Sequence, residues 1–281
     1  MYKNYKVLTV IPVILALLSV VFVSVNGLNQ SIDVSGGTEI TVIVPNNFDY
    51  SSLEKQYPDV DFKISTSSSA QYLDVKAGTN VDIDGLRNSL ATALNTDDLS
   101  KLQYTEKQIG STLSSNFWSQ GFQAVGFAFL FMAIVVYAIF RTPVPSFAVI
   151  LAAASDIVIA VGGMSLFGIP ISTSTIAALL MLIGYSVDTD IMLTTRVLKR
   201  KSDTLENRIN QSMKTGMTMS ITTIVAMAVL YLVVSYIVPA AEMLKDISIV
   251  LLIGLIADLM LTWVTNVGIL RYYVTELKKS K

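Results

Sequence analysis

The sequence predicts an α-helical membrane protein into which one water-exposed domain of mixed α and β structure is inserted. The 281 residues are 52% hydrophobic and only 15% charged, which is too apolar for an ordinary soluble domain. Apolar segments long enough to span a bilayer occur six times, and a polar stretch at residues 26–115 separates the first from the other five. We therefore expect a polytopic protein with six membrane-spanning helices and one inserted domain.

The first apolar segment, residues 7–25, follows Lys3 and Lys6. It is longer than the apolar part of a cleaved signal peptide, and no clear small-residue cleavage site follows it. We expect residues 1–25 to form an N-terminal tip and the first membrane helix, in which Pro12 can introduce a bend.

The polar stretch, residues 26–115, has the alternation of short strands and amphipathic helices. The pattern predicts strands at 39–44, 60–65, 72–76 and 102–109, and helices at 49–57 and 82–94. This order, β-α-β-β-α-β, is typical of a ferredoxin-like sandwich of one sheet and two helices. The sequence therefore predicts an α+β domain inserted after the first membrane helix.

Five further apolar segments follow the polar stretch. We expect membrane helices two to six within residues 116–270, with an inner loop at 196–214 and a tail at 271–281. The five segments are residues 117–140, 146–167, 171–193, 217–237 and 247–270.

The Lys and Arg residues predict the orientation in the membrane. If the six segments alternate across the bilayer, thirteen of the twenty basic residues lie on the side of the N-terminus. Short loops determine orientation, because long domains translocate largely regardless of charge. We expect a cell-membrane protein with both termini in the cytoplasm and residues 26–115 outside. The basic cluster in the inner loop is typical of a topology anchor or a contact to anionic membrane lipid, the alternative being a docking surface. It comprises Arg196, Lys199, Arg200 and Lys201.

Asp156 is the strongest candidate for a functional residue within the membrane. It lies about ten residues into its apolar segment, and a carboxylate at a helix centre costs roughly 2.5 to 3.5 kcal/mol on insertion scales. A carboxyl group in an apolar medium favours its neutral form, so alternate wetting and drying of this residue would release and take up a proton. The alternative is a neutral structural acid that holds two helices together. Possible partners are hydroxyls of Thr173, Thr175, Ser186, Thr218, Ser220, Thr222 and Thr223.

Three other acids and one base are further candidates for the proton path. Asp258 lies midway along the last segment. Asp188 lies about 25 Å along a helix that begins near residue 171, close to the far face of a core about 30 Å thick. Asp188 and Asp190 are therefore either functional acids or residues at the water boundary, and Arg196 is best interpreted as a snorkelling anchor.

The composition excludes several other kinds of chemistry. The chain has no Cys and no His, so thiol chemistry and the commonest metal ligand are missing. No enzyme site, metal site or cofactor is expected. The net charge of −1 gives no indication of a nucleic-acid partner.

Several motifs resemble the SecF branch of the SecD/SecF protein-export family, in its archaeal form. The element Asp33-x-x-Gly36-Gly37-Thr38 is similar to one that the family carries after its first membrane helix. The chain differs at Gly110-Ser111, where the family usually has Gly-Pro. The other matching residues are Ile169-Pro170, the run 175–178, Gly184-Tyr185-Ser186-Val187-Asp188 and Arg196.

The resemblance implies an accessory subunit of the Sec export machinery. Such a subunit would act with SecD and a SecYE-type channel on an unfolded secretory polypeptide, driven by the proton-motive force, with a role for Asp156 in proton movement. The same helix architecture occurs in resistance-nodulation-division exporters, so a proton-coupled exporter of lipids or small hydrophobic molecules is one alternative. A second is an intramembrane protease that uses Asp156 with Asp188, although its usual Gly-x-Gly-Asp element is absent.

Overall fold

A computed structural model describes most of the chain. The described residues are 10–68, 70–96, 99–102, 104–199, 203–238 and 241–277. The expected N-terminal tip, the end of the C-terminal tail, and Arg200 and Lys201 of the basic cluster lie outside these ranges.

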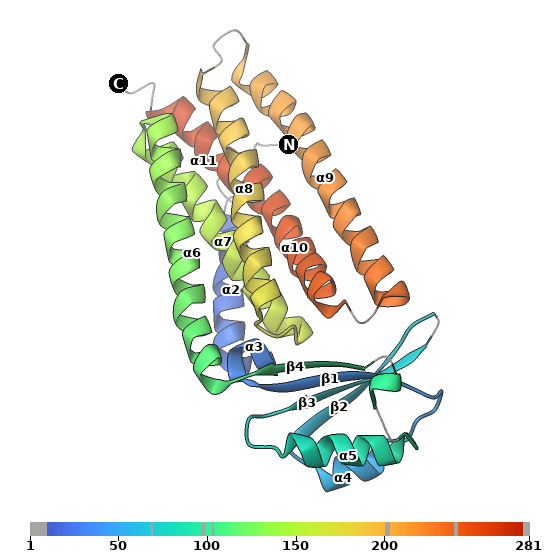
Figure 1. The fold of residues 1–281 in the computed structure, drawn as a ribbon. Coiled ribbons are helices and arrows are strands. Elements are labelled where there is room, and N and C mark those ends of the chain that lie inside the picture. The colour runs from blue at the N-terminus through green and yellow to red at the C-terminus, as the bar shows by residue number, and fades with distance from the viewer. Residues whose placement is uncertain are drawn as a thin grey trace.

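The molecule consists of a bundle of long helices with a small sheet domain at one end (Figure 1). Five helical spans are long and apolar enough to cross a membrane, and a sixth apolar helix, α2 (Val10–Asn26), has 17 described residues. The other bundle elements are α6 (Ser111–Phe140), α7 (Pro143–Phe167), α8 (Thr173–Lys199) and α9 (Leu205–Ile237), followed by one continuous stretch of α10 (Glu242–Met260), η2 (Leu261–Asn266), α11 (Val267–Tyr272) and η3 (Tyr273–Leu277).

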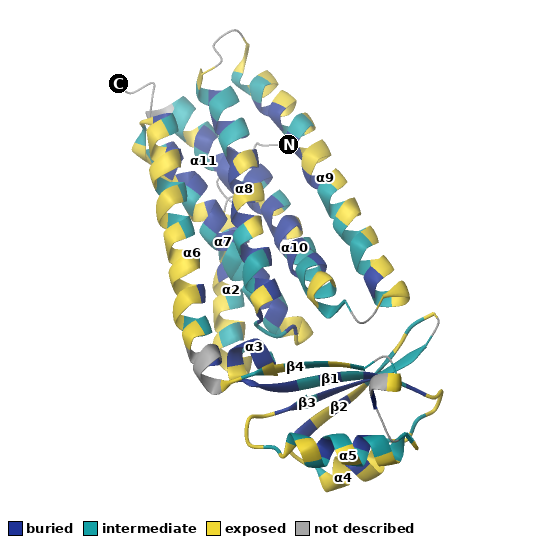
Figure 2. Ribbon diagram, viewed as in Figure 1, coloured by how far each residue is buried: buried dark blue, intermediate teal, exposed yellow. Residues whose placement is uncertain are grey.

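Helices α7, α8 and α10 form the centre of the bundle, whereas α6 and α9 lie at its edge (Figure 2). About half of the apolar window is buried in α7, in α8 and in the span that begins with α10 (50%, 50% and 56%), against 11% in α6 and in α9. Small residues allow the central helices to approach closely. A Cβ atom on Gly254 of α10, for example, would lie 2.3 Å from Leu182 of α8.

The sheet domain has four antiparallel strands in the order β2-β3-β1-β4. The strands are β1 (Gly37–Val44), β2 (Val60–Thr66), β3 (Gln71–Ala77) and β4 (Tyr104–Ile109). Helices α4 (Ser51–Gln56) and α5 (Ile83–Ala93) cover the face that is turned away from the bundle (Figure 1). Between sheet and helices lies a core that includes Ile40, Val42, Leu73, Leu86 and Leu90. The predicted order β-α-β-β-α-β is confirmed.

The two faces of the sheet differ in chemistry because side chains alternate along each strand. On β1, Ile40 and Val42 enter the core, while Glu39 and Thr41 point to the opposite face. That face is turned toward the bundle (Figure 1). A polar sheet face therefore meets the end of the membrane helices.

The structure differs from the predicted elements in two places. Residues 32–35, for which no helix was predicted, form the short helix α3 (Ile32–Ser35), in which the Asp33 amide donates to Ser31 Oγ. The expected inner loop at 196–214 is mostly helical, because α8 continues to Lys199 and α9 begins at Leu205. Apolar periodicity marks only the part of a helix within the membrane, whereas the cap of α9 is a hydrogen bond from the Asn207 amide to Thr204 (3.3 Å).

The return from the sheet domain to the bundle is short. β4 ends at Ile109, and α6 begins at Ser111 with Gly110 between them. In the Gly110-Ser111 pair, which departs from the family pattern, Gly110 is thus the only residue between β4 and α6.

Candidate functional site

Three aspartates from three central helices form a buried acid cluster within the bundle. Asp156 comes from α7, Asp190 from α8 and Asp258 from α10. Their exposed fractions are 0%, 0% and 1%, so none of them reaches the bundle surface. Two strong sequence candidates, Asp156 and Asp258, therefore meet in space, together with one of the two acids near the end of α8.

The cluster is connected by hydrogen bonds from hydroxyl and amide groups. Ser186 donates to Asp156 Oδ2 (2.5 Å), and Asn266 Nδ2 donates to Asp190 Oδ1 (2.6 Å). Thr262 Oγ1 lies 2.9 Å from Asp190 Oδ1 and 3.1 Å from Asp258 Oδ1. These hydrogen bonds join Asp258 of α10 to Asp190 of α8 through Thr262, and Asp156 of α7 to Ser186 of α8.

No ion pair among the described residues includes a member of the acid cluster. One oxygen of Asp156 and one of Asp190 also have no hydrogen-bond partner. An unpaired buried charge costs several kcal/mol, so three simultaneous carboxylates are excluded at this depth without water. Without water, the net negative charge of the cluster therefore stays low only if some of its carboxyl groups are protonated.

A π-helical turn lies beside the acid cluster. It comprises η2, which follows α10 without interruption and carries both Thr262 and Asn266. Such turns are rare and often lie at functional sites. Sequence analysis missed Thr262 and Asn266, although a spacing of four residues from Asp258 through Thr262 to Asn266 could have indicated one polar helix face within an apolar segment.

Asp188 and Arg196 lie away from the acid cluster. Asp188 is exposed on the outer face of α8, where it lines a shallow hollow with Arg196 and Lys199. Arg196 donates to the Gln211 carbonyl and to Thr215 Oγ1, both at 3.0 Å, and so joins α8 to α9. The acid pair that a two-aspartate protease would need, Asp156 with Asp188, is not brought together.

Gly184 and Tyr185 of the run 184–188 are also exposed on α8, whereas Ser186 of the same run is buried and donates to Asp156. Tyr185 is 43% exposed, and a Cβ atom on Gly184 would meet nothing within 4 Å. These residues therefore belong to an outer surface of the bundle and contribute no contact to the acid cluster.

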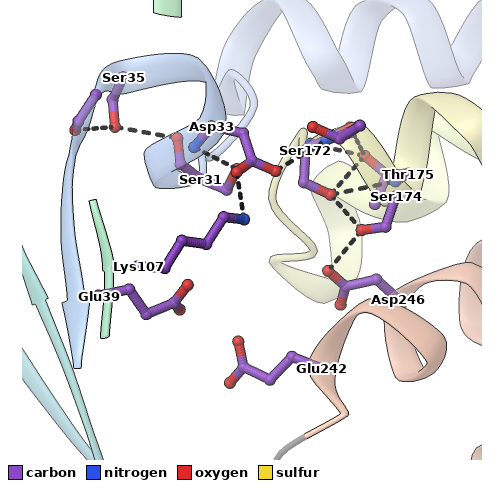
Figure 3. Close-up of polar contacts among 12 residues, drawn as sticks. Ser31, Asp33, Ser35, Glu39, Lys107, Ser172, Ser174, Thr175, Glu242 and Asp246 are labelled. Carbon is purple, nitrogen blue, oxygen red and sulfur yellow. Dashed lines mark hydrogen bonds and ion pairs between the residues drawn. The ribbon is translucent and has the colours of Figure 1, made fainter. Parts of the chain in front are cut away.

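Another buried aspartate, Asp33, lies at the boundary between the bundle and the sheet domain (Figure 3). Asp33 Oδ1 accepts from Lys107 Nζ of β4 at 2.6 Å, and Oδ2 accepts from the backbone amide of Thr173, the first residue of α8, at 3.1 Å. Burial alone would raise the pKa of Asp33, but the hydrogen bonds from Lys107 and Thr173 hold it below its ordinary value. Asp33 is therefore a charged helix cap.

Further contacts extend this boundary into what we call the polar junction, which comprises Asp33, Lys107, Thr173, Lys76, Glu39 and Glu242. Figure 3 labels Asp33, Lys107, Glu39 and Glu242. Lys76 of β3 lies 3.1 Å from Glu39 of β1 and 3.6 Å from Glu242, the first residue of α10. Burial lowers the pKa of Lys76, but the two carboxylates raise it further than burial lowers it. The junction thus binds the sheet to the N-terminal ends of α8 and α10.

The remaining motif residues shape the backbone around the polar junction. Gly36 and Gly37 have φ angles of 74° and 133°, which favour glycine, and a Cβ atom on Gly37 would lie 2.3 Å from the Ala77 carbonyl oxygen. Pro170 lies in the turn before α8, where its carbonyl accepts from Thr175 Oγ1 (3.4 Å). In the same turn, the Ser31 amide donates to the Ile171 carbonyl (3.0 Å).

Comparison with known proteins identifies the family. Residues 89–276 match the family model described as protein export membrane protein SecD/SecF, C-terminal. The chain is 49% identical to the protein-export membrane protein SecF of Methanocaldococcus jannaschii over the full length of both chains. It is 46% identical to SecF of Methanothermobacter thermautotrophicus, over 97% of this chain and 93% of that one.

Two solved structures share the fold. The crystal structure of SecDF, a translocon-associated membrane protein from Thermus thermophilus, superposes with a TM-score of 0.71 at 22% identity, over 96% of this chain and 38% of that chain. A heavy metal efflux pump superposes with a TM-score of 0.50 at 14% identity, over 74% of this chain and 22% of that chain. The full-length relatives decide the assignment: the chain belongs to the SecF proteins of the SecD/SecF family of protein-export membrane proteins.

Proposed function

We propose that the protein acts with a SecD-type partner to promote the translocation of unfolded secretory polypeptides through a SecYE-type channel, and that protons passing through the acid cluster drive this work. The observation that carries the proton step is the acid cluster itself. Three buried carboxyls from three helices have hydroxyl and amide partners but no cation. Alternate hydration from the two sides of the membrane would then change the number of protons that they hold.

Movement of the same helices would transmit this change to the sheet domain. α8 carries Asp190 in the membrane and, about 26 Å away at 1.5 Å per residue, places the Thr173 amide on Asp33. α10 carries Asp258 and places Glu242 beside Lys76. A shift of either helix would therefore move the polar junction, and with it the surface that meets the exported polypeptide.

The membrane arrangement that fits this function has six spans, with α2 as the first. Its 17 described residues cover about 26 Å, close to the thickness of the hydrocarbon core. The β-α-β-β-α-β order and sheet order support a ferredoxin-like domain. In this arrangement that domain lies outside the cell membrane, both termini are cytoplasmic, and α6 and α9 offer their exposed faces to lipid or to the SecD-type partner.

Secretion measured in cells tests the proton step. The full chain would be expressed with its SecD-type partner in cells that lack their own copy, and export of a reporter would be followed. Asp156→Asn should reduce export to the level of cells without the protein, because an amide cannot carry the proton. Asp188→Asn is the matched control and should leave export unchanged. Normal export by Asp156→Asn at normal protein level would contradict the proposal.

One observation favours a second candidate function, a proton-coupled exporter of lipids or small hydrophobic molecules. The fold likeness to a heavy metal efflux pump covers 74% of this chain. Purification in a gentle detergent followed by mass spectrometry separates the two functions. Recovery of a SecD-type protein supports export of polypeptides, whereas a homotrimer that moves a dye across vesicles supports the exporter.

A further inference from the structure

The hydroxyl of Thr262 contacts two acids at once. Thr262 Oγ1 lies 2.9 Å from Asp190 Oδ1 and 3.1 Å from Asp258 Oδ1, and all three side chains are at most 1% exposed. A hydroxyl has one proton, so it can donate to only one of the two carboxyls at a time. The other carboxyl forms a hydrogen bond with the hydroxyl only by donating its own proton. Thr262 thus requires one of its two acid partners to be protonated.

Asn266 decides which acid is the acceptor. Its amide nitrogen donates to Asp190 Oδ1, the same oxygen that Thr262 contacts. An amide nitrogen has protons to give but cannot accept one. This hydrogen bond stabilises a negative charge on Asp190. With Asp190 charged, the Thr262 hydroxyl donates to Asp190, and Asp258 is the acid that holds a proton and donates it to Thr262.

The π-helical turn explains how Thr262 and Asn266 reach one oxygen. In an α-helix, each step of four residues rotates the side-chain direction about 40° past a full turn. Two such steps lead from Asp258 to Asn266, so Asn266 would point about 80° away from Asp258. The wider turn that begins at Leu261 counteracts this drift, because it holds more residues per turn. The irregular turn thus keeps Thr262 and Asn266 directed at Asp190.

We propose that Thr262 relays a proton between Asp258 and Asp190. In the relay, the O–H bond of Asp258 breaks and its proton passes to Thr262 Oγ1. The proton that Thr262 held passes at the same time to Asp190 Oδ1. Thr262 is a neutral hydroxyl before and after, Asp258 becomes a carboxylate and Asp190 a carboxylic acid. The step needs no other reactant, and it rests on the proposed function because it requires protons to cross the acid cluster.

Two substitutions at one position test the relay. Thr262→Val removes the hydroxyl but keeps the shape, and Thr262→Ser keeps the hydroxyl. The full chain with its SecD-type partner would be reconstituted in vesicles, and proton entry would be measured after a pH difference is imposed. Because a positioned group contributes about 10²- to 10⁴-fold to proton transfer, Thr262→Val should slow proton entry by about 100-fold or more, while Thr262→Ser stays close to the unchanged protein.

The outcomes separate the relay from the proposed function. Thr262→Val vesicles that take up protons at the rate of the unchanged protein would overturn the relay alone. Vesicles of the unchanged protein that take up none would overturn both the relay and the proposed function. Slow entry in both variants would also overturn the relay, because a packing defect, not the missing hydroxyl, would then be responsible. Thr262→Ala also lacks the hydroxyl and should be as slow as Thr262→Val, which separates loss of the hydroxyl from a disturbance caused by valine. Normal proton entry in Thr262→Ala would overturn the relay.

Discussion

Two of the sites at which the molecule buries aspartates, the polar junction and the acid cluster, treat them in opposite ways. Asp33 in the polar junction accepts hydrogen bonds from the Lys107 ammonium group and from the backbone amide of Thr173. The acid cluster has hydrogen bonds only with hydroxyl and amide groups. Among the described residues, none of its three acids forms an ion pair. A paired carboxylate keeps its charge and holds two elements together. An unpaired one responds to hydration, so the difference distinguishes a structural acid from one that can drive a cycle.

Replacing the acids of the cluster gives the largest expected effect on activity. Asp190→Asn and Asp258→Asn keep the side-chain volume and remove the exchangeable proton. We expect reporter secretion to fall to the level of cells without the protein, while the amount of folded protein is unchanged. Loss of the protein itself, shown by immunoblot of the membrane fraction, would instead mean that the cluster is structural, like Asp33.

Removing the cation of Asp33 should mainly weaken structure. Breaking a fully buried pair costs about 3–5 kcal/mol, but the Lys107 side chain is 34% exposed, so we expect about 1–3 kcal/mol for Lys107→Met. The readout is hydrogen exchange at the amides of Ser31 and Thr173, which the junction holds. Lys107→Arg should retain most of the protection. Unchanged exchange in Lys107→Met would show that Asp33 does not need its partner.

The pH dependence of the polar junction has a defined sign. Because the pKa of Asp33 is lowered by folding, its contribution is present above the ordinary range of Asp and is lost as the pH falls through the lowered value. The pKa of Lys76 is raised, so its contribution is lost only as the pH rises above the ordinary range of Lys. The protection of the Thr173 amide, which donates to Asp33, should therefore stay constant between about pH 5 and 9. A change inside this window would contradict the assignment of Asp33 as permanently charged.

The smallest effect is expected on the outer face of α8. Asp188 is exposed and has no place in either buried site. Asp188→Asn should change the thermal unfolding of the purified protein by no more than about 0.5 kcal/mol and leave secretion unaltered. A large loss of secretion would return Asp188 to the proton path and would weaken the distinction between paired and unpaired acids.

Local sequence patterns were sufficient to predict the elements. Long apolar runs predicted the five long spans, and strand alternation predicted the sheet domain with its order of elements. Both features depend on residues close together in the chain. The extension of α8 and α9 beyond the apolar runs was not predicted, because caps and contacts between the two helices determine it.

The acid cluster could be predicted only in part. Depth along a helix indicated Asp156 and Asp258, but it could not separate Asp188 from Asp190. Side chains two positions apart, such as those of Asp188 and Asp190, point about 200° apart around the helix axis. One acid therefore enters the bundle and the other faces outward, and only the packing of α7, α10 and α8 decides which. The roles of Thr262 and Asn266 depend on the π-helical turn, for which the sequence carries no clear local signal.

Infrared spectroscopy of the carboxyl groups tests the central claim most directly. Spectra of the full chain with its SecD-type partner would be compared across the window of about pH 5 to 9 in which Asp33 and Lys76 keep their charges. Our account predicts that a protonated-carboxyl band changes with pH and disappears in Asp190→Asn or Asp258→Asn, but persists in Asp33→Asn. A band that is constant across the window, or one that only Asp33→Asn removes, would contradict it.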